Sequence, residues 1–236
     1  MTEIFSDISE IADAVAGILS DLIAVPDERT IHIALSGGNT PKIIFKYLAE
    51  NYGNKFADRR IHYWWGDERC VPPTDDDSNY KWANNLWLSP VGVAKQNIHR
   101  IKGENNCCEE VLVYTDEIKK VVPFKNGFPC FDLILLGLGD DGHTASIFPD
   151  RIGELLDSFQ LCECVEYPGT GKHRITLTGK VLNNARKLVF IVTGANKDLI
   201  VRDVVAFSNP SYPASHIKPA DGEVIWLLDK GSARLL

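Results

Sequence analysis

Apolar residues form short unbroken runs in some parts of the chain and recur at intervals of three and four in others. The short runs have the length of strands, and a run without polar alternation is typical of a strand buried on both faces of a parallel sheet. One run is rich in aromatic residues, which favours a strand further. The predicted strands span 31–35, 60–65, 131–136, 174–178, 187–193 and 223–229.

The segments between these runs carry helical spacing. Asp7 is placed to cap the first helix, with Glu10 as a box-like partner, and Thr40 and Pro41 suit the N-cap and first position of another. Strands that alternate with helices are typical of an α/β fold with a mostly parallel sheet covered on both faces. The predicted helices begin near residues 8, 41, 79, 109, 179 and 198. Residues 151–165 contain a poorly defined helical segment and an edge strand.

The composition fits one α/β domain spanning residues 1–236, since 44% hydrophobic content in 236 residues supports a sizeable core. The net charge of −7, with no long basic run, argues against nucleic acid or an anionic membrane as the main partner. The N-terminal segment is interrupted by acidic residues, so it predicts neither a signal peptide nor a membrane span.

The cysteines carry a prediction about compartment and metals. None of the six lies in a C-x-x-C pair, and the adjacent Cys107 and Cys108 are poorly placed to bond to each other. We therefore expect reduced thiols in a cytoplasmic protein, without a zinc site or a disulfide framework.

The chemistry concentrates after the buried run at 131–136. Three glycines, Asp140, Asp141 and His143 follow within seven residues, where ligands bind in open α/β sheets. The segment 137–142 also matches the dinucleotide fingerprint G-x-G-x-x-G. We reject that interpretation because two carboxylates in the loop would repel a pyrophosphate, and Pro149 soon interrupts any helix.

A second candidate loop follows the strand at 31–35. Ser36, Gly37, Gly38, Asn39 and Thr40 join that strand to a helix start, where free N–H groups and the helix dipole favour an anion. No Gly-Lys-Ser/Thr closes this loop, so it is not a Walker A motif. An ordinary βα turn is the alternative.

Two further strand ends contribute charged residues. Asp67, Glu68 and Arg69 follow the strand at 60–65, and the planar fork of Arg69 suits a phosphate or an oxyanion. Lys197 lies beyond the strand at 187–193, near a helix start that disfavours a cation. A surface salt-bridge cluster and a solvated lysine are the alternatives. Together the four strand ends predict a crevice for a phosphorylated small molecule and acid–base chemistry.

Four blocks of the chain carry a family resemblance that covers nearly its whole length. The blocks are LSGGNTP at 35–41, WGDER at 65–69 with DSN at 77–79, GLGDDGHTASIFP at 137–149 and VTGANK at 192–197. They occur in the order found in 6-phosphogluconolactonases. This resemblance implies hydrolysis of 6-phospho-D-glucono-1,5-lactone to 6-phosphogluconate in the oxidative pentose phosphate pathway, without a cofactor or a metal. It also implies a fold related to those of glucosamine-6-phosphate deaminases and ribose-5-phosphate isomerases.

Two other functions remain open at this point. Sugar-phosphate deaminases share a similar loop and an Asp-Gly-His motif, but they carry a glutamate where this chain has Phe148 and a tyrosine where it has Arg69. Both departures favour the lactonase. A non-catalytic sugar-phosphate sensor would need the anion loop but not His143.

His143 is the predicted general base that activates water against the lactone carbonyl, because an unperturbed histidine titrates near neutrality. Asp141 or Asp67 is expected to orient its ring or to bind sugar hydroxyls, and the sequence does not separate these roles. Residues 36–40 and Lys197 are expected to hold the phosphate, while Arg69 and Arg174 are expected at phosphate or lactone oxygens. The sequence leaves the oligomeric state open.

Overall fold

The computed structural model describes residues 1–26 and 28–236. Its main layer is a sheet of six strands in which every neighbouring pair is parallel. The strands lie in the spatial order β1 (Thr2–Phe5), β11 (Glu223–Asp229), β10 (Lys187–Val192), β7 (Leu133–Leu136), β2 (Ile31–Leu35) and β3 (Ile61–Trp65).

The chain runs outward from β2 to β3 and later fills the other side of β2 with β7, β10 and β11. The direction of winding therefore reverses between β2 and β7. Such a switch point opens a crevice beyond the carboxyl ends of the two strands, which is where α/β proteins bind ligands.

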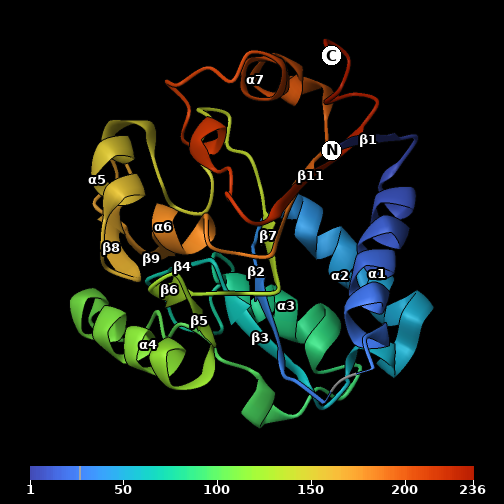
Figure 1. Cartoon of the computed structure of the whole chain (residues 1–236), viewed down its shortest axis with the longest axis vertical. Coiled ribbons are helices and arrows are strands. Elements are labelled where there is room, and N and C mark those ends of the chain that lie inside the picture. The colour runs from blue at the N-terminus through green and yellow to red at the C-terminus, as the bar shows by residue number, and fades with distance from the viewer. Residues whose placement is uncertain (27) are drawn as a thin grey trace.

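Helices cover both faces of this sheet. α1 (Ile8–Ala24) and α2 (Asn39–Tyr52) lie on one face, while α4 (Cys107–Val121), α5 (Ile152–Asp157) and α6 (Gly179–Leu182) lie on the other (Figure 1). α3 (Asn79–Ala83) continues as a π-helical segment to Leu88, and α7 (Asp198–Val201) continues likewise to Ala206. Single 3₁₀ turns span Gly53–Phe56, Lys95–Asn97, Pro149–Arg151, Ala195–Lys197 and Pro213–His216.

The buried apolar residues form one continuous cluster that extends through the sheet and the helices on both faces. All five residues of β2 and all four of β7 are buried, as their unbroken apolar runs predict. The α/β class, the mostly parallel sheet and its helical layers are therefore confirmed. No helix among the described residues is long and apolar enough to cross a membrane.

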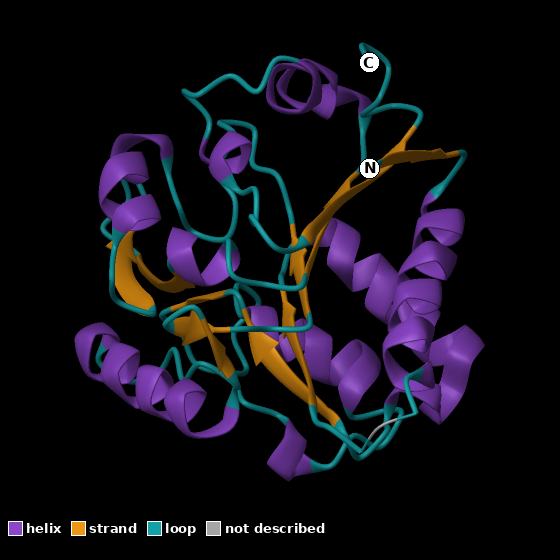
Figure 2. Cartoon of the chain, viewed as in Figure 1, coloured by secondary structure: helices purple, strands orange, loops and turns teal. Residues whose placement is uncertain are grey.

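One predicted strand belongs to a different sheet. β9 (His173–Leu177) pairs antiparallel with β4 (Asp67–Arg69) and with β8 (Cys162–Glu166). Figure 2 shows this smaller sheet beside the central one, on the side away from α1 and α2. The short β4 follows β3 after a single glycine, so the chain passes from one sheet to the other at the point where its charged residues begin. The sequence also did not reveal β1 or the hairpin of β5 (Phe124–Lys125) and β6 (Phe128–Pro129).

Two helix starts test the predicted caps. The Asp7 side chain accepts hydrogen bonds from the backbone N–H groups of Ser9 and Glu10, which confirms the first cap. The cap predicted for Thr40 is wrong, because α2 already begins at Asn39. Gly38 occupies the N-cap with φ of 114°, a conformation that suits glycine.

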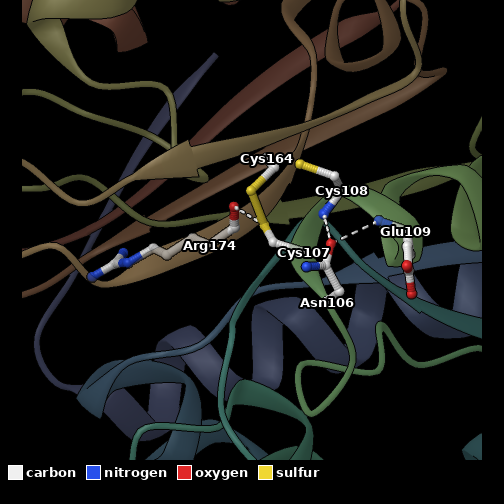
Figure 3. The surroundings of a disulfide bond; sticks show 6 residues. All are labelled: Asn106, Cys107, Cys108, Glu109, Cys164 and Arg174. Atoms are coloured by element: carbon white, nitrogen blue, oxygen red, sulfur yellow. Dashed lines mark hydrogen bonds between the residues drawn. A yellow bond between two sulfur atoms is a disulfide. The ribbon is translucent and has the colours of Figure 1, made fainter.

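The expectation that all thiols are reduced is also wrong. Cys107, at the start of α4, and Cys164, on β8, are bonded as a disulfide with their Cα atoms 5.8 Å apart. The pair is 57 residues apart in sequence, so local spacing did not reveal it. Its sulfur at Cys107 lies 3.7 Å from the carbonyl oxygen of Arg174. Figure 3 shows the Arg174 guanidinium pointing away from this bond.

Candidate active site

The predicted crevice exists at the switch point between β2 and β7. A pocket of about 190 Å³ is lined by residues from the loops that follow β2 and β7, from β4 after β3, and from α3 and β9. A second pocket of about 430 Å³ adjoins it, shares Gly37, Gly38, Gly137 and Leu138 with it, and reaches Lys197. The two pockets together bring the four predicted strand ends to one edge of the sheet.

The loop after β7 folds back on itself through backbone hydrogen bonds. The N–H of Gly139 donates to the carbonyl of His143 over 2.8 Å, and the N–H of Gly142 donates to the carbonyl of Gly139 over 3.1 Å. A Cβ at Gly139 would lie 2.1 Å from the Nδ1 atom of His143, so only glycine fits there. No helix follows before Pro149, which agrees with the rejection of a dinucleotide site.

His143 is paired with Asp141. The distance from its Nδ1 to the Asp141 Oδ1 is 2.5 Å, and both side chains are partly exposed. Burial would raise the pKa of Asp141, but the hydrogen bond from His143 and the charge of its ring outweigh this and hold that pKa below its usual value. The His143 ring also packs near Phe148, with the ring centres 5.1 Å apart. Of the two aspartates that the sequence left open, Asp141 therefore holds the histidine.

Asp67 lies in a different environment, where it is 5% exposed. The Ser146 hydroxyl donates to its Oδ2 over 2.7 Å, and the Asn79 amide donates to its backbone carbonyl over 2.9 Å. An Arg174 guanidinium nitrogen lies 4.0 Å from the same Oδ2. Asp67 lines the smaller pocket, and the structure records no contact between its carboxylate and His143.

Arg69 and Arg174 are opposite each other on β4 and β9. Arg69 donates to the carbonyl of Asp77 over 2.8 Å, and its buried Nε has no hydrogen-bond partner among the described residues. The Arg174 guanidinium packs 4.3 Å from the centre of the Tyr167 ring. Burial lowers the pKa of Arg174, against the attraction of Asp67, and the charge of Arg69 lowers it further. Two guanidinium groups thus line the pocket that His143 also lines.

The loop after β2 forms one wall of both pockets. A Cβ at Gly37 would lie 1.7 Å from the Asn79 side-chain oxygen, so the loop packs tightly against α3. The Thr40 hydroxyl lies 2.7 Å from that of Thr193, which joins the start of α2 to the end of β10. The first-turn N–H groups of a helix have no partner within the helix, and here they border the larger pocket.

Lys197 reaches the same pocket from the end of the 3₁₀ turn after β10. Its ammonium donates to the carbonyl of Leu138 over 2.8 Å and lies 2.5 Å from the Asp140 carboxylate. Ser36 is buried at the carboxyl end of β2 and lines the smaller pocket. Every residue to which the sequence analysis gave a catalytic or binding role therefore lines one of the two pockets, except that Asp141 reaches the smaller one through His143.

Glu68 points elsewhere, although it lies between two residues of the pocket. Its carboxylate accepts hydrogen bonds from the backbone N–H groups of Asn79 and Tyr80 and from the Ser78 hydroxyl. It thereby holds the start of α3. Burial raises its pKa to about 7 in spite of these N–H donors.

Sequence reasoning missed two polar residues that support the site. Asn79 and Ser146 are both buried and both bind Asp67. Each lies inside a block that carries the family resemblance, DSN at 77–79 and GLGDDGHTASIFP at 137–149, so that signal was available.

The arrangement combines a histidine paired with a carboxylate, two guanidinium groups and an adjoining anion cradle. We use this name for the loop at 36–40 together with Lys197, which border the larger pocket. Such a set can activate water, stabilise an oxyanion and anchor a phosphate. Among the described residues, no group of three or more histidine, cysteine, aspartate or glutamate side chains is arranged to hold a metal ion.

Comparison with known proteins gives matches over almost the whole chain. The sequence profile described as glucosamine-6-phosphate isomerases/6-phosphogluconolactonase matches residues 6–226. The chain is 40% identical to the 6-phosphogluconolactonase of Haemophilus influenzae over 209 residues, which cover 87% of this chain and 88% of that protein.

Solved structures agree with this match. The 6-phosphogluconolactonase from Trypanosoma brucei superposes with a TM-score of 0.87 at 26% identity, covering 100% of this chain and 98% of that one. A monomeric glucosamine-6-phosphate deaminase superposes with a TM-score of 0.78 at 18% identity, over 100% of this chain and 99% of that one. The second likeness concerns the fold alone, and it confirms the predicted relation to the deaminase fold.

Proposed function

The chain belongs to the glucosamine-6-phosphate isomerase/6-phosphogluconolactonase family, and we propose that its crevice hydrolyses 6-phospho-D-glucono-1,5-lactone to 6-phosphogluconate. The observation that carries the proposal is the His143–Asp141 pair at the mouth of a pocket that continues into an anion cradle. The pair supplies the base, and the cradle selects a phosphorylated substrate.

His143 acts as the general base. Because its Nδ1 faces the Asp141 carboxylate, Nδ1 carries a proton and Nε2 is left to accept one from water. The resulting hydroxide attacks the lactone carbonyl carbon and forms a tetrahedral intermediate. When the carbonyl re-forms, the bond to the ring oxygen breaks, and the protonated histidine returns its proton to that leaving oxygen.

Arg69 and Arg174 stabilise the oxyanion that forms at the carbonyl. Both line the pocket with His143, and the buried Nε of Arg69 has no partner among the described residues. A donor already held in place lowers the barrier without reorganising during the reaction. The Asp67 carboxylate lies 4.0 Å from the Arg174 guanidinium and attracts it, while hydrogen bonds from Ser146 and Asn79 hold Asp67 in position.

The phosphate occupies the larger pocket. There the N-terminus of α2 presents the backbone N–H groups of Asn39 and Thr40, and Lys197 contributes its charge. The glycines at positions 37 and 38 allow the backbone to approach a ligand closely. This anchor positions the lactone carbonyl at the smaller pocket, which turns a bimolecular reaction into an oriented one.

Phe148 argues against deaminase chemistry in this crevice. Its ring is fully buried, packs near His143 and stands where the deaminases carry a glutamate. A carboxylate that deaminase chemistry would use is therefore replaced by an apolar side chain.

The decisive assay uses purified protein after EDTA treatment and freshly generated 6-phosphogluconolactone, with the spontaneous opening of the lactone subtracted. We expect rapid hydrolysis and no ammonia from glucosamine 6-phosphate. Ammonia release at a comparable rate would overturn the assignment, and loss of activity with EDTA would overturn the predicted metal independence. A cytoplasmic location and the absence of a nucleic-acid partner stay predictions.

The phosphate anchor is tested by Lys197→Ala, assayed on the phosphorylated lactone and on plain gluconolactone. Losing a charge-assisted contact is expected to cost about 1.5–3 kcal/mol on the phosphorylated substrate, mainly as a higher KM. An equal loss on both substrates would contradict a phosphate role.

A further inference from the structure

The cation of the anion cradle is already paired with an acid. Among the described residues that line the larger pocket, Lys197 carries the only charged side chain. Its ammonium lies 2.5 Å from Asp140 Oδ1, while its side chain is 18% exposed and that of Asp140 is 80% exposed. The Asp140 carboxylate is thus the exposed partner of a largely covered lysine, and a phosphate bound to that lysine would share it with this carboxylate.

We infer that Asp140 sets the affinity of the cradle for phosphorylated ligands by competing with the phosphate for Lys197. This inference rests on the proposed function, since it requires the phosphate to bind in the larger pocket. Asp140 acts as a specificity-determining residue: it weakens binding of the phosphate group and thereby limits how tightly substrate and product are held.

The hydrogen bonds of Lys197 support competition. An ammonium has three N–H donors, and here one reaches the Leu138 carbonyl and another faces Asp140. The Leu138 contact fixes the lysine to the loop after β7 whether or not Asp140 is present. A phosphate can therefore take the place of the carboxylate without the lysine losing its position.

Charge repulsion predicts the same effect on phosphate binding even if the Asp140 carboxylate stays beside the lysine. A carboxylate beside a bound phosphate repels it, and it offsets the charge of Lys197, the one positive side chain among the described residues that line the larger pocket. Both routes predict that removing the charge of Asp140 strengthens phosphate binding. Asp141, the next residue, has a separate task because its carboxylate faces His143 instead.

The test is Asp140→Asn, which keeps the size of the side chain and removes its charge. The dissociation constants of inorganic phosphate and of 6-phosphogluconate are measured by calorimetry, and KM is measured on the phosphorylated lactone. We expect each to fall by about two- to five-fold, the size that partly exposed ion pairs reach. The ratio of kcat/KM on the phosphorylated lactone to kcat/KM on gluconolactone is expected to rise by the same factor.

Two further variants make the result specific. In a Lys197→Ala background, Asp140→Asn is expected to give a smaller gain in phosphate binding than in the unchanged protein, because the competition for Lys197 is gone and only the direct repulsion between Asp140 and the phosphate remains. Asp150→Asn removes the same charge from an exposed aspartate ten residues further along the chain and is expected to leave the dissociation constants unchanged.

The outcomes separate this inference from the proposed function. If Lys197→Ala weakens phosphate binding but Asp140→Asn leaves it unchanged or weakens it too, Asp140 supports the lysine and the inference is wrong. An equal gain from Asp150→Asn would also overturn it, since the effect would then be one of net charge. If Lys197→Ala leaves phosphate binding unchanged, Lys197 does not anchor the phosphate, and both that part of the proposed function and the inference about Asp140 are wrong.

Discussion

The two walls of the crevice are built in opposite ways. One wall is formed by Asp67 on β4 and Arg174 on β9, with Ser146 and Asn79 bonded to Asp67. Asp67, Ser146 and Asn79 are buried, and the Arg174 side chain is 14% exposed. The wall on the loop after β7 presents charged pairs to the solvent, with Asp141 49% exposed and Asp140 80% exposed. We call them the buried wall and the exposed wall.

The difference follows from the neighbours of each wall. The buried wall belongs to a sheet that packs against α4 and is tied to it by a disulfide, so its donors keep their positions when substrate arrives. The exposed wall belongs to a glycine loop, where protons and phosphate must enter and leave. Preorganised donors suit an oxyanion, whereas accessible groups suit proton transfer. Changes in the exposed wall are therefore expected to alter catalysis, and changes in the buried wall to alter stability as well.

The largest effect is expected from His143→Ala, in the exposed wall. Loss of the general base should lower kcat by about 10²–10⁴-fold with a modest change in KM. Stability should change little, because the side chain is partly exposed. Turnover within a few-fold of the unchanged protein, in a variant whose circular dichroism and melting curve are normal, would remove His143 from this role.

Reduction of the Cys107–Cys164 disulfide tests the support of the buried wall. Opening a bridge between residues 57 positions apart is expected to lower the free energy of unfolding by about 2–4 kcal/mol. Melting curves with and without a dithiol reductant measure it, and Cys164→Ser provides the matched variant. A reductant that lowers the melting temperature of Cys164→Ser as much as that of the unchanged protein would show that the effect lies elsewhere.

Glu68 predicts how the stability of the buried wall depends on pH. Because its pKa is raised to about 7 from 4.5, the folded protein favours the protonated form. Its contribution is fully present below pH 4.5 and is lost as the pH rises through 7, a change of about 3 kcal/mol. Urea unfolding at several pH values, compared between the unchanged protein and Glu68→Gln, isolates this residue. The stability of the unchanged protein should fall relative to that of the variant as pH rises; a relative gain would show that the N–H donors outweigh burial.

The smallest effects come from a matched pair of aspartates, one in each wall. Asp67→Asn replaces one of the two carboxylate oxygens with an NH2 group, so a buried donor that faces that oxygen loses its acceptor, and the change is expected to cost about 1–3 kcal/mol of stability. Asp141→Asn removes a partly exposed carboxylate and is expected to cost less than about 1 kcal/mol, while kcat falls because the histidine loses its orientation. Equal stability losses in urea unfolding would mean that the two walls do not differ in this way.

The sequence by itself determined the layout of the site. Unbroken apolar runs located the strands, and glycines with polar residues after them located the loops, because strand burial and turn chemistry are written in neighbouring residues. Parallel strands end at one edge of their sheet, so the loops at 36–40, 67–69 and 137–143 could be placed together in advance. His143 was therefore placed in this crevice from the sequence alone, and its role as the base stays a prediction.

Only the tertiary structure decided which polar groups meet. Side chains alternate along a strand, so in β4 Asp67 and Arg69 line the pocket while Glu68 turns to α3. Contacts between residues far apart in sequence leave no local pattern, since each partner is compatible with many others until the core brings the strands into register. Three pairs in this protein are of this kind: Cys107 with Cys164, Lys197 with Asp140, and Ser146 with Asp67.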